Sequence, residues 1–201
     1  MTGSPIWGAQ VETITSAAAT FGDERPAWLV AHSGAGPLLP AVDERMPVGG
    51  WVFVDATLPH PGRTRFQTLP TSLVDRFGAA AGAGQLPRWN EWFDPGVIEA
   101  VLPDRKMRAA FIAELPDLPR AMFDERMPDA TTPPGRQLAY VQLSAAYATE
   151  ADDARIAGWP LAILVGDHLW PLTHPGAVAS AICDVVDGCD PGQITGTSGD
   201  P

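Results

Sequence analysis

The sequence of 201 residues contains few of the features that bind metals, cross membranes or hold nucleic acid. It has two cysteines, Cys183 and Cys189, no C-x-x-C pair, and four histidines without the spacing of a zinc site. No apolar run approaches the ~18–20 residues of a membrane span. Acidic residues outnumber Lys and Arg by 24 to 13, and the net charge of −11 leaves no basic patch for nucleic acid. We therefore expect no metal, no cofactor, no membrane and no nucleic-acid partner.

The first ten residues have neither a basic start nor an apolar core, so they do not resemble an export signal. We expect a cytoplasmic protein whose two cysteines are reduced thiols. The many Ala, Gly, Pro, Asp and Arg residues in an acidic chain are typical of a high-GC bacterium. The length suits one domain with a single core, which we expect over residues 1–190, followed by a disordered tail at 191–201.

Buried strands alternate with helices outside the middle of the chain. Apolar runs predict strands at 25–33, 49–59, 136–144 and 160–168. Helices are expected at 5–20, 36–46, 68–84, 147–159 and 174–188, and prolines divide the Trp-rich middle into short helices at 95–101, 104–114 and 117–124. This alternation predicts an α/β protein with about four parallel strands flanked by helices.

The stretch "LVAHSGAGPLLPAV", residues 29 to 42, places a serine where an apolar strand meets a helix. Such a serine, between residues almost without side chains, is typical of a nucleophile elbow, whose tight turn pushes the hydroxyl above the sheet. We expect Ser33 to be a nucleophile and the Gly34 N–H to bind an oxyanion. Ala31 and Ala35 replace both glycines of the strict G-x-S-x-G pattern, so a small-residue turn without chemistry is the alternative.

His168 follows the last predicted strand and is therefore expected near Ser33, because the carboxyl ends of parallel strands share one edge of a sheet. The acid is less well defined. Asp55 ends the strand after the Ser33 strand, and its carboxylate could orient the His168 imidazole and stabilise its charged form. A turn former is the alternative for Asp55. Asp152 and Asp153 are other candidate acids, although a solvated helix face is the simpler interpretation for them.

Several segments together resemble the α/β-hydrolase superfamily, in particular actinobacterial α/β-fold hydrolases. They are H-S-G-A-G-P-L-L-P (32–40), V-D-A-T-L-P (54–59), W-N-E-W (89–92), L-S-A-A-Y (143–147), G-W-P (158–160), G-D-H-L (166–169) and P-G-A-V-A (175–179). The resemblance covers nearly the whole chain. It implies that Ser33 is the nucleophile, that His168 is the base, and that a small Trp-rich helical cap is inserted at about 85–130.

The resemblance also implies a substrate site lined by four aromatic residues: Trp89, Trp92, Phe93 and Tyr147. The two tryptophans would form a lid, and aromatic residues that only build the core of the cap are the alternative. Tyr147 stands where the superfamily most often has its acid, which is why the acid stays open between Asp55 and other carboxylates.

The chain departs from the superfamily before the elbow, where about four strands are usual and only one helix is predicted here. We therefore expect a truncated α/β-hydrolase fold that lacks the loop with the second oxyanion N–H, a loss that typically costs ~10²–10³ in rate. The strand at 27–32 would keep an apolar free edge. Residues 1–25 or a second subunit could cover that edge, and we expect a homodimer.

These residues leave three functions open. The first is a serine hydrolase of esterase, thioesterase or lactonase type, which acts on a small to medium apolar acyl substrate through Ser33, His168 and Asp55. The second is a non-hydrolytic enzyme of secondary metabolism, a cyclase, eliminase (dehydratase) or isomerase that uses the same residues with Tyr147 for acid–base chemistry. The third is a domain that binds a ligand or partner without catalysis. We favour the first.

Overall fold

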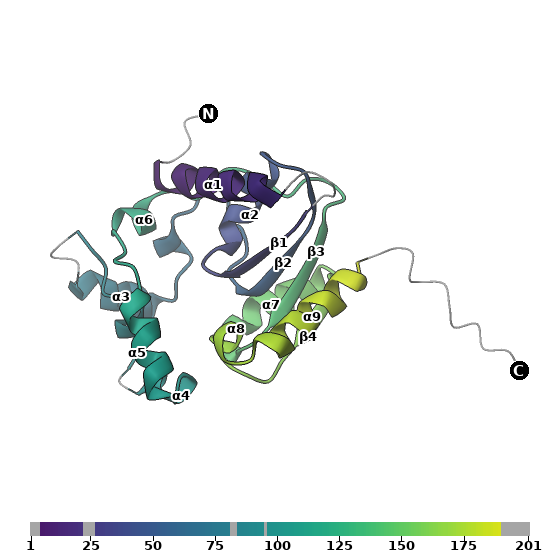
Figure 1. The fold of residues 1–201 in the computed structure, drawn as a ribbon. Helices are drawn as coiled ribbons and strands as arrows, with labels where there is room; N and C mark the ends of the chain where they lie inside the picture. The colour runs from purple at the N-terminus through teal and green to yellow at the C-terminus, as the bar shows by residue number, and fades with distance from the viewer. Residues whose placement is uncertain (1–4, 22–26, 81–83, 95, 190–201) are drawn as a thin grey trace, which may run out of the picture.

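A four-stranded parallel sheet forms the centre of the computed structural model, which describes residues 5–21, 27–80, 84–94 and 96–189 (Figure 1). The strands lie side by side in chain order: β1 (Ala27–Ser33), β2 (Val48–Ala56), β3 (Gln137–Gln142) and β4 (Leu161–Ile163). The helices are α1 (Pro5–Ala18), α2 (Leu39–Asp43), α3 (Thr71–Ala80), α4 (Val97–Val101), α5 (Arg105–Glu114), α6 (Ala121–Asp124), α7 (Ala148–Ile156), α8 (Trp170–Thr173) and α9 (Pro175–Asp187). The predicted α/β class with four parallel strands flanked by helices is confirmed.

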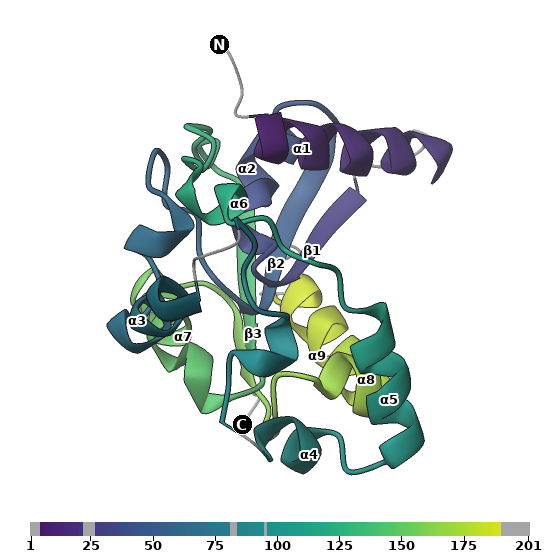
Figure 2. The ribbon, with the colours of Figure 1, turned by 90° about the vertical axis from the view of Figure 1, so that its left-hand side faces the viewer.

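The sheet is covered on both faces because side chains along β2 alternate between them. Trp51 and Phe53 belong to a buried cluster with α2 and α7, whereas Val52 and Val54 pack with α9. Figure 2 shows α7 and α9 on opposite sides of β3. The central position of β2 explains why its apolar run is continuous rather than alternating with polar residues.

The last strand is shorter than the prediction of 160–168. Pairing with β3 ends soon after Ile163, with backbone bonds from Leu164 N–H to the Gln142 carbonyl and from Gly166 N–H to the Leu143 carbonyl. The Asp167 carboxylate then accepts the Leu169 N–H at 2.8 Å, which turns the chain into α8. Helix α8 was not predicted, because its four residues are too few for a periodic pattern.

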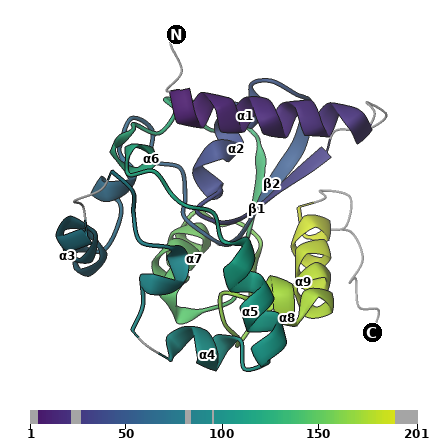
Figure 3. The ribbon, with the colours of Figure 1, turned by 60° about the vertical axis from the view of Figure 1, so that its left-hand side comes forward.

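Helix α1 lies across α2 rather than along the edge of β1, as Figure 3 shows. Its Trp7 and Val11 are buried against Leu38 and Val42. In the described part of the chain β1 pairs only with β2, and Val30 on β1 is 50% exposed. Residues 5–21 therefore leave the outer edge of β1 uncovered, and the other residues predicted to cover it, 1–4 and 22–25, lie outside the described ranges.

The segment between β2 and β3 lies beside the sheet and carries α3 to α6 (Figure 1). Its own cluster consists of Phe77, Leu86 and Phe123, with Trp92 packed against them. Helix α6 begins at Ala121, four residues later than predicted. The division into a main domain and a cap at 85–130 stays a prediction, and the predicted tail at 191–201 lies outside the described residues.

No helix among the described residues combines the length and apolarity of a membrane span, and both cysteines are free.

Replacement of Phe53 by alanine tests the packing of the sheet. Phe53 is 0% exposed and stacks with Tyr140 and Trp159, so Phe53→Ala should lower the free energy of unfolding by about 3–5 kcal/mol. Ile156→Ala is the control, because Ile156 is 85% exposed and its truncation should cost less than about 0.5 kcal/mol. Urea unfolding followed by tryptophan fluorescence measures both. Equal effects of the two substitutions would contradict the described core.

Candidate active site

Ser33 lies at the turn where β1 ends and the 3-10 segment η2 (Gly36–Leu38) begins. Its φ of 57° is in the left-handed region, which a non-glycine residue adopts rarely. The close approach that requires glycine is at Gly36, where a Cβ would lie 2.0 Å from the Thr57 carbonyl oxygen. This explains why alanine is accepted at position 35: the glycine that the turn needs stands one residue later.

Asp55 and His168 reach the same edge of the sheet from neighbouring elements. Asp55 precedes the last residue of β2, and Ala56 is the β-sheet partner of Ser33, so the two strand ends coincide. Asp55 also has a positive φ, 43°, and the Tyr140 hydroxyl holds the bend by bonding both the N–H and the carbonyl of Ala56. His168 comes from the loop between β4 and α8.

The three side chains form a continuous chain of hydrogen bonds. His168 Nε2 lies 2.9 Å from Ser33 Oγ, and His168 Nδ1 lies 2.9 Å from Asp55 Oδ2. A carboxylate only accepts, so Nδ1 carries the imidazole proton and Nε2 is left to accept the Ser33 hydroxyl proton. This tautomer makes His168 a base toward Ser33.

The Asp55 carboxylate is fully buried and has four donors. Besides His168, it accepts the N–H groups of Leu143 and Ser144 at 2.8 and 3.0 Å and the Ser144 hydroxyl at 2.6 Å. Burial alone would raise the pKa of Asp55, but the hydrogen bonds from His168, Ser144 and the two N–H groups together lower it. The group is therefore a stable anion. The other candidate acids, Asp152 and Asp153, are exposed on α7.

Aromatic rings enclose the His168 imidazole. Ring centroids of His32, Tyr147 and Trp89 lie 4.4, 5.0 and 6.2 Å from it, all in stacked orientation. His32 Nε2 also donates to the His168 carbonyl at 2.9 Å, so it fixes both the ring and the backbone of the base. Phe93 packs against Trp89 with a centroid distance of 5.0 Å.

Trp92 is placed differently from the other predicted lining residues. Its ring packs against Phe77 and Phe123, and its Nε1 donates to the Pro87 carbonyl at 2.8 Å. Trp92 is thus part of the apolar core beside α3 and α6, whereas Trp89 and Tyr147 contact His168.

Two further donors lie at the elbow. The Tyr147 hydroxyl is 3.3 Å from Ser33 Oγ, and it is the donor because the Ser33 proton points to His168. Burial raises the pKa of Tyr147, so this hydroxyl stays protonated at neutral pH. Among the hydrogen bonds of the described residues, none uses the Gly34 N–H, whereas the Gly34 carbonyl accepts Nη2 of Arg65.

Sequence reasoning missed Arg65 and the bond that His32 makes. Arg65 belongs to the 3-10 turn η3 (Arg65–Gln67), opened by a capping box between Thr64 and Gln67. That box is a recognisable signal for the turn, but no local pattern places the arginine against Gly34, 31 residues earlier.

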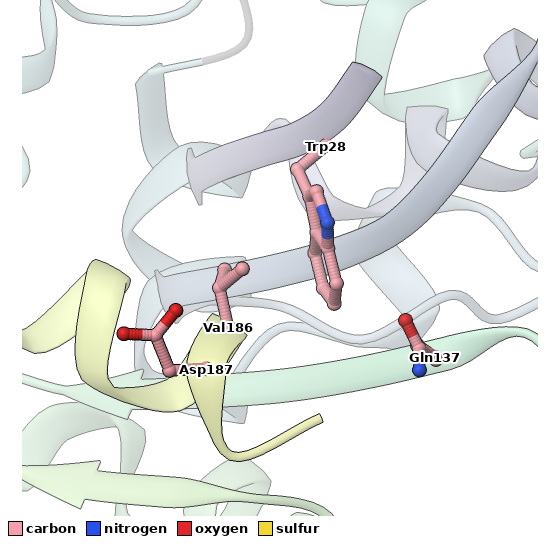
Figure 4. A pocket seen from close by; sticks show the side chains of 4 residues that line it. All are labelled: Trp28, Gln137, Val186 and Asp187. Carbon is pink, nitrogen blue, oxygen red and sulfur yellow. The ribbon is translucent and has the colours of Figure 1, made fainter. Parts of the chain in front are cut away.

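A hollow of about 210 Å³ opens at the other end of the strands, lined by Trp28, Gln137, Val186 and Asp187 (Figure 4). It contains none of the hydrogen-bonded residues above. It is also smaller than the ~300–1,000 Å³ typical of small-molecule sites.

The structure is similar to solved enzymes of one fold. An extracellular α/β-hydrolase from a Paenibacillus species matches with a TM-score of 0.65 and 17% identity over 87% of this chain and 77% of that chain. Tomato methylketone synthase I matches at 0.56 and 12% over 90% and 78%, and the pyrethroid hydrolase PytH at 0.53 and 18% over 88% and 77%.

The chain has the α/β-hydrolase fold. At these identities the likeness establishes the fold alone, and the sequence matches no protein-family model and no curated protein.

The pH dependence of stability tests the environment of His32. Burial, with a smaller contribution from His168, lowers the pKa of His32 to about 4. The unfolded chain, with a pKa of about 6.5, then binds more protons than the folded chain between those two values, so stability falls as the pH is lowered through this window. In His32→Gln, which keeps a donor for the His168 carbonyl, the slope should be shallower by up to about 1.4 kcal/mol per pH unit.

Urea unfolding at several pH values between about 4 and 7 measures the slope for both proteins. Parallel curves for the wild type and His32→Gln would contradict a His32 that is held neutral.

Proposed function

We propose that this protein is a serine hydrolase that cleaves a small to medium ester, thioester or lactone with an apolar acyl group. Ser33 is the nucleophile, His168 the general base and acid, and Asp55 the group that orients His168. The observation that supports the proposal is the pair of 2.9 Å contacts from the His168 ring, one to Ser33 and one to Asp55.

In the first step Ser33 Oγ bonds to the substrate carbonyl carbon while its proton passes to His168 Nε2. The carbonyl π electrons move to oxygen, and the Gly34 N–H stabilises that charge. Collapse breaks the bond to the leaving alcohol or thiol, which takes the proton from His168. Water then gives a proton to His168 as its oxygen bonds to the acyl carbon. Collapse breaks the bond between that carbon and Ser33 Oγ, His168 returns the proton to Ser33 Oγ, and the acid is released. The buried anion of Asp55 stabilises the imidazolium in both halves.

The rings near His168 support an apolar acyl substrate. Trp89 and Phe93 come from the segment beside the sheet and Tyr147 from the turn after β3, so apolar surface approaches the base from two elements. Such rings exclude water and bind acyl chains by burying apolar area.

One observation favours acid–base chemistry without a covalent intermediate as a second candidate. The Tyr147 hydroxyl lies 3.3 Å from Ser33 Oγ, so a protonated donor stands beside the base His168. An elimination, cyclisation or isomerisation would use His168 to remove a proton and Tyr147 to supply one.

Labelling and kinetics separate the two candidates. A fluorophosphonate probe should label wild-type protein on Ser33, and Ser33→Ala should lose both labelling and hydrolysis of p-nitrophenyl butyrate. Asp55→Asn should lower kcat by about 10⁴, because the imidazole would then adopt the other tautomer. The matched control is Ser72→Ala, which changes an exposed serine of α3 and should leave both readouts intact. An activity that survives Ser33→Ala but not His168→Ala would overturn the hydrolase proposal in favour of the second candidate.

We also propose a homodimer that covers the edge of β1. The support is the outer edge of this strand, which pairs with no other strand in the described ranges 5–21, 27–80, 84–94 and 96–189. Val30 on this strand is half exposed. Light scattering at micromolar concentration should give twice the mass of one chain, and Val30→Glu should shift it toward the monomer. Ile156→Glu, which changes an 85% exposed residue at the end of α7, should not. A wild-type monomer would refute this assembly.

A further inference from the structure

Arg65 places a guanidinium against the residue that follows the nucleophile. Its Nη2 donates to the Gly34 carbonyl, and a Cβ at position 34 would lie only 2.8 Å from its Nη1. A side chain at position 34 would therefore have to displace the guanidinium. Nη1 therefore lies beside the Cα of Gly34, the residue whose N–H is free at the elbow.

The guanidinium is held in place by rings rather than by charge. Its carbon lies 4.6 Å from the ring centroid of Trp7 on α1 and 5.7 Å from that of Phe123 on α6. These cation–π contacts orient a planar group without neutralising it. The side chain thus reaches the elbow from η3 in a fixed direction.

No carboxylate of the described residues forms an ion pair with Arg65. Its Nε is buried without an acceptor, and the same is true of Nε1 of the neighbouring Trp7. Burial lowers the pKa of Arg65 to about 10, so the side chain remains a cation at neutral pH. In a chain of net charge −11, a half-buried cation without an ion-pair partner among the described residues is available to bind a negative charge.

We propose that Arg65 supplies the second donor of the oxyanion hole, with Nη1 hydrogen-bonded to the substrate oxygen that the Gly34 N–H also binds. This inference rests on the proposed hydrolase function and adds a catalytic residue to it. As Ser33 Oγ bonds to the carbonyl carbon, the electron pair of the C=O π bond moves to oxygen, and the fixed guanidinium faces that charge without reorganising. No proton leaves Arg65, and its charge is unchanged when the intermediate collapses.

Such a side chain does the work usually done by a second backbone N–H in this fold. It acts on the transition state more than on the ground state, because a neutral ester oxygen gains less from a full positive charge than an oxyanion does. The expected signature is therefore a loss in kcat with little change in KM.

The test compares Arg65→Gln, Arg65→Lys and wild type on two esters of similar length, p-nitrophenyl butyrate and the mono-p-nitrophenyl ester of glutarate. Arg65→Gln should lower kcat by about 10²–10³ for both esters with KM nearly unchanged, and Arg65→Lys should retain an intermediate rate. The Ki of butylboronic acid, which forms a tetrahedral adduct with the serine, should rise by the same factor as kcat/KM falls. Binding of butyramide, a planar ground-state analogue, should not change.

Arg63→Gln is the matched control, since it removes the same charge from an exposed arginine two residues away. It should leave both esters unaffected. Circular dichroism and urea unfolding check that each variant is folded. If Arg65→Gln does not fold, the kcat of Arg65→Lys is compared with that of the wild type instead.

Three outcomes would overturn the inference. A rise in KM for the glutarate ester alone would make Arg65 a binding group for a substrate carboxylate. Unchanged kcat in a folded variant would leave Arg65 as a support of the elbow only, with the hydrolase proposal intact. A wild type that neither reacts with the fluorophosphonate nor hydrolyses either ester would refute the hydrolase proposal and this inference with it.

Discussion

The hydrogen bond between His168 and the buried Asp55 is the contact on which the rest of the site depends. It fixes the proton on Nδ1, which leaves Nε2 free to face Ser33 at 2.9 Å. The carboxylate remains charged without water because backbone N–H groups and the Ser144 hydroxyl also donate to it. Those donors belong to the two residues that directly follow β3, so the chain at this edge of the sheet replaces water around the anion. The parallel register of the sheet therefore has two effects. It aligns the strand ends that carry the site, and it places the donors of Leu143 and Ser144 at the Asp55 carboxylate.

Backbone strain is confined to the same edge of the sheet. Among the described residues, Ser33 and Asp55 are the non-glycine positions with positive φ, and they lie at adjacent strand ends. The bonds from Tyr140 to Ala56 and the close fit of Gly36 against Thr57 hold these conformations in place. A packed sheet below the site therefore maintains a geometry that isolated turns would not keep.

The sequence predicted the parts of the molecule that depend on local pattern. Apolar runs predicted the strands, and the strand ends predicted that Ser33, Asp55 and His168 lie close together, because parallel strands bring their carboxyl ends to one edge. The local pattern could not give contacts that cross the fold. Trp89 and Trp92 look alike in W-N-E-W, yet one ring stacks over His168 and the other packs against Phe77.

The position of Arg65 also could not be predicted from local sequence. Its contact with Gly34 depends on how η3, α1 and α6 pack together, not on its neighbours in the chain. The end of β4 was misplaced for a related reason. The apolar residues after Ile163 continue the strand pattern, but Val165 is 95% exposed and Asp167 starts a turn.

The hydrogen bond between His168 and Asp55 is tested by measuring the protonation of the two His168 ring nitrogens in ¹⁵N-labelled protein at neutral pH. NMR signals are assigned to His168 by their loss in His168→Gln. We expect a proton on Nδ1 and none on Nε2 in the wild type, with this preference lost in Asp55→Asn. An imidazole that carries its proton on Nε2, or that exchanges freely between both forms in the wild type, would contradict it.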